Sequence, residues 1–100
     1  MLVKDNIVEF IRENRAVLKD QFSITKIGLF GSFARNEQTE SSDIDLLIDL
    51  EDNTPDIHEL KEELKAFIGA RFQRNVAIAR EKFLKPYARE IILSEVEYVE

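Results

Sequence analysis

The sequence predicts an α/β (α+β) fold: one small domain, residues 1–100, with a mixed β-sheet and helices packed mainly on one face. Two observations predict this. Helical and strand-like apolar patterns alternate in the order helix, strand, Gly-Ser turn, strand, helix, strand, helix, which is typical of a two-layer domain. Hydrophobic residues make up 44% of the chain, enough for one core and too many for a disordered chain.

The first helix is expected over residues 2–20. Its apolar residues follow the spacing of an amphipathic helix, with charged residues between them: Val3, Ile7, Phe10, Ile11 and Leu18. We expect this helix to pack on the sheet. Residues 22–25 connect it to a short strand over residues 26–30.

This strand ends at a Gly-Ser pair that opens a short helix, Gly31–Asn36. Gly31 lets the backbone approach a bulky anion because it has no Cβ. Ser32 allows two interpretations: its hydroxyl caps the helix, or the free N–H groups of this turn point at a phosphate. The acidic pair downstream favours the phosphate. Arg35 contacts a phosphate or a partner, or pairs with a nearby acid, and Asn36 tolerates the left-handed backbone of a turn.

Two carboxylates head the second strand, Asp43–Leu50, which follows a polar loop over residues 37–42. Asp43 and Asp45 lie two residues apart, so their side chains project from the same face of the strand. Carboxylates aimed at one place repel each other unless a cation lies between them. Their oxygens suit Mg²⁺, which commonly binds one or two carboxylates together with substrate phosphates. Asp49 lies too far along the strand to join the same ion.

The middle of the chain supplies a helix and a third strand. Thr54 and Pro55 predict the helix start, as N-cap and first helical residue, and helical spacing then runs to about Phe72. The strand is expected over residues 75–79. If it lies beside the second strand, Ala77 is on the face that carries the acids.

A last helix is expected to begin at Pro86. Its helical spacing predicts inward-facing side chains at Tyr87, Ile91 and Ile92. Val96 either continues this inward row or begins an edge strand that runs to Val99.

Composition excludes several classes of protein. Lys and Arg number 14 and Asp and Glu 20, so the formal charge is −6 (14 − 20) and direct binding of duplex nucleic acid is not expected. A small substrate carrying its own Mg²⁺, or a protein with a basic surface, suits this charge better. The absence of cysteine excludes disulfides and thiolate zinc sites. The charged N-terminus does not resemble a signal peptide and no apolar run is long enough for a membrane span, so we expect a cytoplasmic location.

Residues 31–50 read GSFARNEQTESSDIDLLIDL, with a Gly-Ser pair, a spacer and an Asp-x-Asp pair in that order. This stretch resembles the signature of the DNA-polymerase-β-like nucleotidyltransferase superfamily. Within it the resemblance is to the minimal nucleotidyltransferases (MNT), which often are antitoxins beside HEPN-domain toxins. It runs from about Ile24 to the C-terminus. Two positions depart from the pattern: Asn36 stands where glycine is usual, and Ala77 where a third aspartate is usual.

The resemblance implies a nucleotidyltransferase site. We expect the nucleotide to be bound by Gly31, Ser32, Arg35 and Ser42, although Ser42 has the alternative use of orienting the carboxylate strand. Asp43 and Asp45 are expected to be catalytic and to ligate Mg²⁺. Related enzymes hold two Mg²⁺ ions with three carboxylates. Because the methyl group of Ala77 cannot ligate, we expect one ion here.

The resemblance also implies transfer of AMP from Mg-ATP, or of another nucleotide, to a hydroxyl of a HEPN-family toxin from an adjacent gene. A tyrosine is the expected acceptor. Ala77 leaves three explanations: a natural non-catalytic relative, another acid that completes the site, or a deliberate Asp→Ala change. Two alternative functions stay open. One is a non-catalytic antitoxin that neutralises its partner by occlusion. The other is a nucleotidyltransferase for a small molecule or RNA, for which no acceptor-binding domain is present.

Overall fold

A four-stranded mixed sheet forms the centre of the computed structural model, which describes residues 1–100. The strand order is β3-β2-β1-β4. Strand β1 (Ile24–Phe30) pairs antiparallel with β2 (Ile44–Leu50) on one side and with β4 (Glu97–Tyr98) on the other. Strand β3 (Val76–Arg80) runs parallel to β2. Because a parallel neighbour requires a crossover, the helix between β2 and β3 lies over the sheet.

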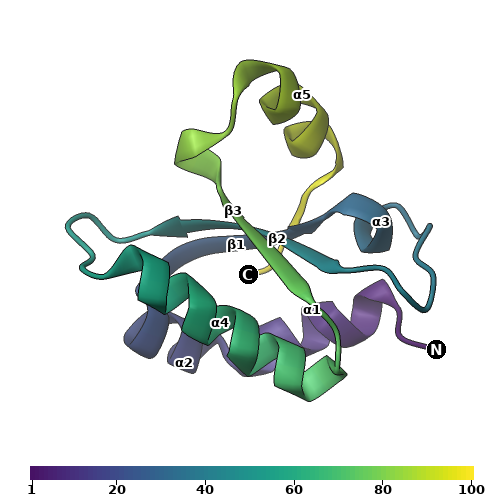
Figure 1. Ribbon diagram of the computed structural model, residues 1–100, viewed down its shortest axis with the longest axis horizontal. Coiled ribbons are helices and arrows are strands. Elements are labelled where there is room, and N and C mark those ends of the chain that lie inside the picture. Colours follow the sequence, from purple (N-terminus) through teal and green to yellow (C-terminus); the bar gives the residue numbers. More distant parts are fainter.

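Three helices cover one face of the sheet: α1 (Lys4–Glu13), α2 (Arg15–Phe22) and α4 (Ile57–Phe72). The opposite side carries α5 (Pro86–Glu95), at the top of Figure 1, with the one-turn helix η1 (Glu81–Phe83) before it. A four-residue helix, α3 (Gly31–Ala34), follows β1 directly. None of the helices has the length and apolar character needed to cross a membrane. The predicted fold class, with helices mainly on one face, is confirmed.

The core lies between the sheet and this helical layer. Alternate residues of the two central strands point into it, including Ile27 and Leu29 of β1 and Leu46 of β2. The helices close the core through an aromatic contact: the rings of Phe10 in α1 and Phe67 in α4 have centroids 5.6 Å apart. This core fixes the orientation of β2, so that its other residues face the side of α5.

The N-terminal helix is divided, where the sequence predicted one continuous helix. Asn14, between α1 and α2, has φ −107° and ψ 19°, and its side-chain Nδ2 donates to the carbonyl oxygen of Phe10 at 2.8 Å. Asparagine side chains compete for backbone partners and so interrupt helices. The carbonyl of Asn14 accepts the N–H of Leu18 at 2.9 Å and thereby opens α2.

Helix α4 begins at Ile57, so the predicted start at Thr54 and Pro55 is wrong. The Thr54 hydroxyl donates to the carbonyl of Glu51 at 2.5 Å and closes the preceding turn instead of capping the helix. The cap position is taken by Asp56, whose φ of 51° is left-handed. The predicted end at Phe72 is confirmed.

Helix α5 begins at Pro86 as predicted, but two of its predicted inward residues point outward. Tyr87 is 75% exposed and Ile91 is 63% exposed. The edge-strand alternative at the C-terminus is confirmed, since β4 pairs with β1. This pairing holds the end of α5 beside β1, and the outer side of the helix meets no other element.

Candidate functional site

Gly31 lies where β1 passes into α3, and its backbone permits no side chain. Its φ is +77°, a left-handed value that favours glycine. A Cβ built on Gly31 would overlap Asp45 Oδ2 and come within 2.9 Å of Asp45 Cγ. The register explains this approach, because Phe30 pairs directly with Asp45. Gly31 therefore brings the first turn of α3 against the acidic strand.

The two carboxylates predicted as a pair lie at the start of β2. Asp43 is exposed and directly precedes the strand, and Asp45 is partly buried within it. Burial raises the pKa of the Asp45 carboxyl, and the nearby charge of Asp43 raises it further. The charge of Glu95 acts in the same direction, whereas Arg35 opposes it. The ionised form of Asp45 is thus disfavoured, and a cation between the two acids would relieve the repulsion.

Ala77 lies beside Asp45, as the strand prediction required. The parallel register of β2 and β3 pairs the two residues directly, and Ala77 is exposed. A carboxylate at this position would face the same side as Asp45. In its place is a methyl group, and no three His, Cys, Asp or Glu side chains are arranged to hold a metal ion.

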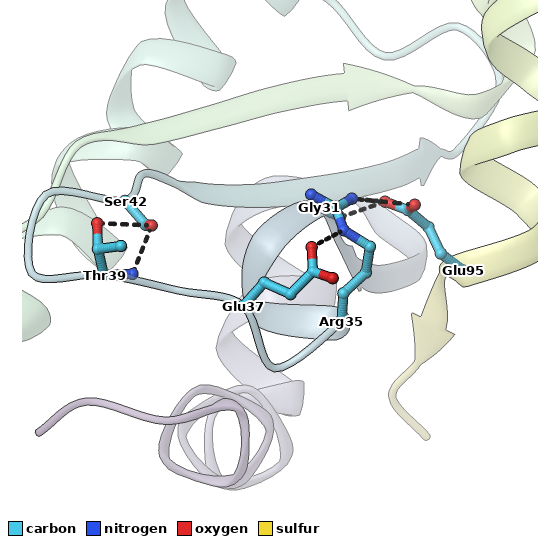
Figure 2. A network of polar contacts seen from close by, with 6 residues as sticks. All are labelled: Gly31, Arg35, Glu37, Thr39, Ser42 and Glu95. Atoms are coloured by element: carbon cyan, nitrogen blue, oxygen red, sulfur yellow. Dashed lines mark hydrogen bonds and ion pairs between the residues drawn. The ribbon is translucent and has the colours of Figure 1, made fainter.

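Arg35 and Glu95 form an ion pair above the first turn of α3 (Figure 2). The Arg35 guanidinium donates to both oxygens of Glu95, at 3.1 and 3.0 Å, and to Glu37 at 2.9 Å. One oxygen of Glu95 also accepts the backbone N–H of Gly31 at 2.6 Å. Sequence analysis did not identify Glu95. It lies at the end of α5, and only the pairing of β4 with β1 brings it to Gly31.

The two predicted serines lie in different parts of the site. The Ser32 hydroxyl caps no helix, so the capping interpretation is wrong. Ser42 Oγ accepts the backbone N–H of Thr39 at 2.8 Å and closes the loop before Asp43 (Figure 2). Arg74, a second residue that sequence analysis did not identify, donates to the carbonyls of Thr39 and Ser42 at 3.0 and 2.9 Å. Ser42 and Arg74 together fix the conformation of the loop that leads into Asp43 and β2.

A polar hollow of about 520 Å³ adjoins Asp43. Ser42, Asp43 and Arg74 line it, and no apolar side chain does. It opens beside Asp43 and is not lined by Asp45, so it offers space for a polar ligand next to Asp43.

The residues present fit one divalent cation. Asp43 and Asp45 supply hard oxygen ligands. The pKa of Asp45 is raised first by burial and then by the charge of Asp43, and a bound cation would favour the ionised form of both acids. Two carboxylates are few for an ion held by protein alone. Mg²⁺ commonly completes such a site with phosphate oxygens and water. The site therefore suits an ion that arrives with a phosphorylated ligand.

Comparison with known proteins places this chain in a family. The Nucleotidyltransferase domain family matches residues 11–99. The protein adenylyltransferase MntA of Thermococcus cleftensis is 34% identical over 101 residues, which cover 99% of this chain and 98% of the relative. A solved structure of a candidate minimal nucleotidyltransferase superposes with a TM-score of 0.76 and 28% identity, covering 96% of this chain and 95% of its own.

A further solved structure shares the fold at lower identity. It is the complex of a tri-AMPylated HEPN toxin of Shewanella oneidensis with an MNT antitoxin. Its TM-score is 0.61 at 15% identity, over 91% of this chain and 70% of the matched one. The family match and the full-length relative together show that the chain belongs to the nucleotidyltransferase domain family, among its minimal nucleotidyltransferases.

Proposed function

We propose that this chain is the antitoxin-type nucleotidyltransferase of a toxin–antitoxin pair, which binds Mg-ATP and directs AMP to a tyrosine hydroxyl of a HEPN-family toxin. The observation that carries the proposal is the contact of Gly31 with Asp45. It brings the predicted phosphate-binding turn against the predicted metal-binding strand, although a polar loop separates the two in the sequence. The full-length likeness to MntA supports the same reaction.

Each residue of the site has one proposed task. The N–H groups at Gly31 and Ser32 and the guanidinium of Arg35 hold the nucleotide phosphates. Asp43 and Asp45 hold Mg²⁺ with oxygens of the same phosphates. When bound, the ion neutralises phosphate charge and aligns the α-phosphate. In the transfer, the acceptor oxygen bonds to the α-phosphorus, pyrophosphate leaves, and the acceptor proton needs a base.

Ala77 removes one participant from this reaction. A carboxylate beside Asp45 would complete an acceptor-side site and take the proton from the hydroxyl. General-base assistance is worth roughly 10²–10⁴-fold in rate. We therefore infer that this chain binds nucleotide but transfers AMP slowly.

A protein supplies the acceptor in this proposal. The 100 residues form the nucleotide-binding core, and the exposed Asp43 leaves the site accessible from outside. The formal charge of −6 favours encounter with a partner that has a basic surface.

The second candidate function is a non-catalytic antitoxin that acts by occlusion. The pairing of Ala77 with Asp45 favours it, because the site lacks the third carboxylate. The two functions differ in covalent chemistry: a transferase leaves an adenylate on its partner, and an occluding antitoxin leaves the partner unmodified.

Co-expression with the adjacent gene product tests the proposal. The partner is purified and its intact mass is measured after incubation with Mg-ATP, using this chain or its Ala77→Asp variant. Transfer predicts an added adenylate on a tyrosine, slowly with the parent and faster with the variant. A stable complex with no adenylate from either protein would favour occlusion, and no complex at all would reject both functions.

A further inference from the structure

Glu95 holds the donors that the proposed function assigns to phosphate. Its carboxylate accepts the Gly31 N–H at 2.6 Å and bonds Arg35 through both oxygens. Its side chain is only 15% exposed, whereas that of Arg35 is 44% exposed, so the bond to Gly31 is partly sheltered while the ion pair remains open to water on the Arg35 side. Figure 2 shows Glu95 reaching from α5 to the turn, and a negatively charged group is therefore already bound there.

The fold places Glu95 at this position through the pairing of β1 with β4. Leu29 pairs with Glu97 in antiparallel register. Two further residues along β1 and two back along β4 bring Gly31 opposite Glu95. The contact lies just beyond this ladder: the side chain of Glu95, the last residue of α5, accepts the backbone N–H of Gly31, the first residue of α3.

Two features of its surroundings oppose this position of Glu95. It is the last residue of α5, where the helix dipole disfavours negative charge, and no basic residue lies in that last turn. Its charge also acts on Asp45, which carries the same sign. The hydrogen bonds to Gly31 and Arg35 offset both effects, and they are the bonds that a phosphate would take over.

We propose that Glu95 is an internal competitor of the nucleotide phosphate, displaced from Gly31 and Arg35 when nucleotide binds. This rests on the proposed function for the assignment of phosphate to these donors. One N–H cannot serve two anions at full strength, and two adjacent anions repel, so phosphate binds only after Glu95 has moved. The apparent affinity for nucleotide is then reduced, because only the small fraction of molecules in which Glu95 is released can bind the phosphate.

Calorimetry with Mg-ATP and with inorganic triphosphate tests the competition. Glu95→Gln removes the charge and keeps a side chain of the same size. Hydrogen bonds to charged groups are stronger than those to neutral groups, so the variant's side chain is displaced more easily and both ligands should bind roughly fivefold tighter. The matched control is Glu90→Gln, which removes the same charge from an exposed position of α5 and should leave affinity unchanged. Unchanged or weaker binding by Glu95→Gln, or no binding by any of the three proteins, would overturn the proposal.

A measurement on the parent protein stands even if the variant does not fold. The carboxyl carbon of Glu95 is followed by NMR while inorganic triphosphate is added to saturation. The expected result is a shift of the Glu95 signal towards that of the exposed Glu90, together with a shift of the Gly31 amide. A Glu95 signal that keeps its position while the Gly31 amide shifts would show that both anions bind at once, and the competitor role would be rejected.

The outcomes separate this inference from the proposed function. Tighter triphosphate binding by Glu95→Gln without any adenylate transfer supports the competitor and rejects the transferase. Adenylate transfer by the parent without tighter binding by the variant does the reverse. If binding by the variant is weaker, Glu95 orients Arg35 as a positioning residue.

Discussion

Ala77 and Asp45 are direct partners in the parallel pairing of β2 with β3. The first is an exposed methyl group, and the second is a partly buried carboxylate whose pKa is raised. An aspartate at position 77 would present its carboxylate beside Asp45 without any change in the backbone. The register therefore allows the proposed role of a third carboxylate to be tested with a single substitution.

Ala77→Asp should raise the rate of adenylate transfer by about 10²–10⁴-fold, the usual contribution of a positioned general base. The measurement is incorporation of labelled AMP into the partner. Ala77→Asn is the matched control, because it has the same shape without basicity and should not raise the rate. Rapid transfer by the parent, unchanged by Ala77→Asp, would mean that another carboxylate completes the site.

Asp43→Asn combined with Asp45→Asn should abolish the Mg²⁺-dependent part of ATP binding, because the ion loses both protein ligands. Calorimetry of the parent should show binding in Mg²⁺ and much less in EDTA. Asp49→Asn removes the same charge further along β2 and should bind as the parent does. A double variant that binds Mg-ATP at parental strength would show that the metal site lies elsewhere.

Gly31→Ala should destabilise the fold by at least about 1–3 kcal/mol, the usual cost of a left-handed backbone in a residue with a Cβ. Overlap with Asp45 adds to this. Urea denaturation measures the free energy of unfolding. Repeating Gly31→Ala in an Asp45→Ala background should recover part of the loss. Equal losses in the two backgrounds would assign the whole effect to the backbone and none to the contact.

Asp45→Asn should raise the melting temperature of the ligand-free protein at neutral pH. Because the pKa of Asp45 is higher in the folded chain than its ordinary value of 3.8, its stabilising contribution is complete at low pH and is lost as pH rises through the raised pKa. The advantage of the variant should therefore be absent at pH 3 and grow above it. Thermal unfolding across this range, with Asp49→Asn as the control, measures it. An advantage that does not change with pH would exclude titration of Asp45 as its cause.

Local features of the chain were predictable because their causes are local. The two-residue period of β2 places Asp43 and Asp45 towards one side and apolar residues towards the core. Gly31 was recognised as a close-approach position, and its φ of +77° agrees. The face of Ala77 also followed from periodicity, given that β3 lies beside β2.

Errors arose where a side chain had a choice of partners. Asn14 bonds back to Phe10 and divides the N-terminal helix, and Thr54 closes a turn instead of capping α4. Both residue types bond to nearby backbone in several ways, and the sequence pattern alone does not choose among them. The outward direction of Tyr87 was also missed, because helical spacing marks a row of side chains without stating which element covers it.

The sequence by itself determined the family, the Gly-Ser turn, the acidic pair and the strand face of Ala77, since each depends on residues close together in the chain or on strand periodicity. Only the tertiary structure decided what binds that turn in the free protein. Glu95 lies 64 positions from Gly31. It reaches this donor because β4 pairs with β1 and sets the end of α5 against the turn. A contact of that kind depends on the register between distant strands, which no local pattern in the sequence fixes.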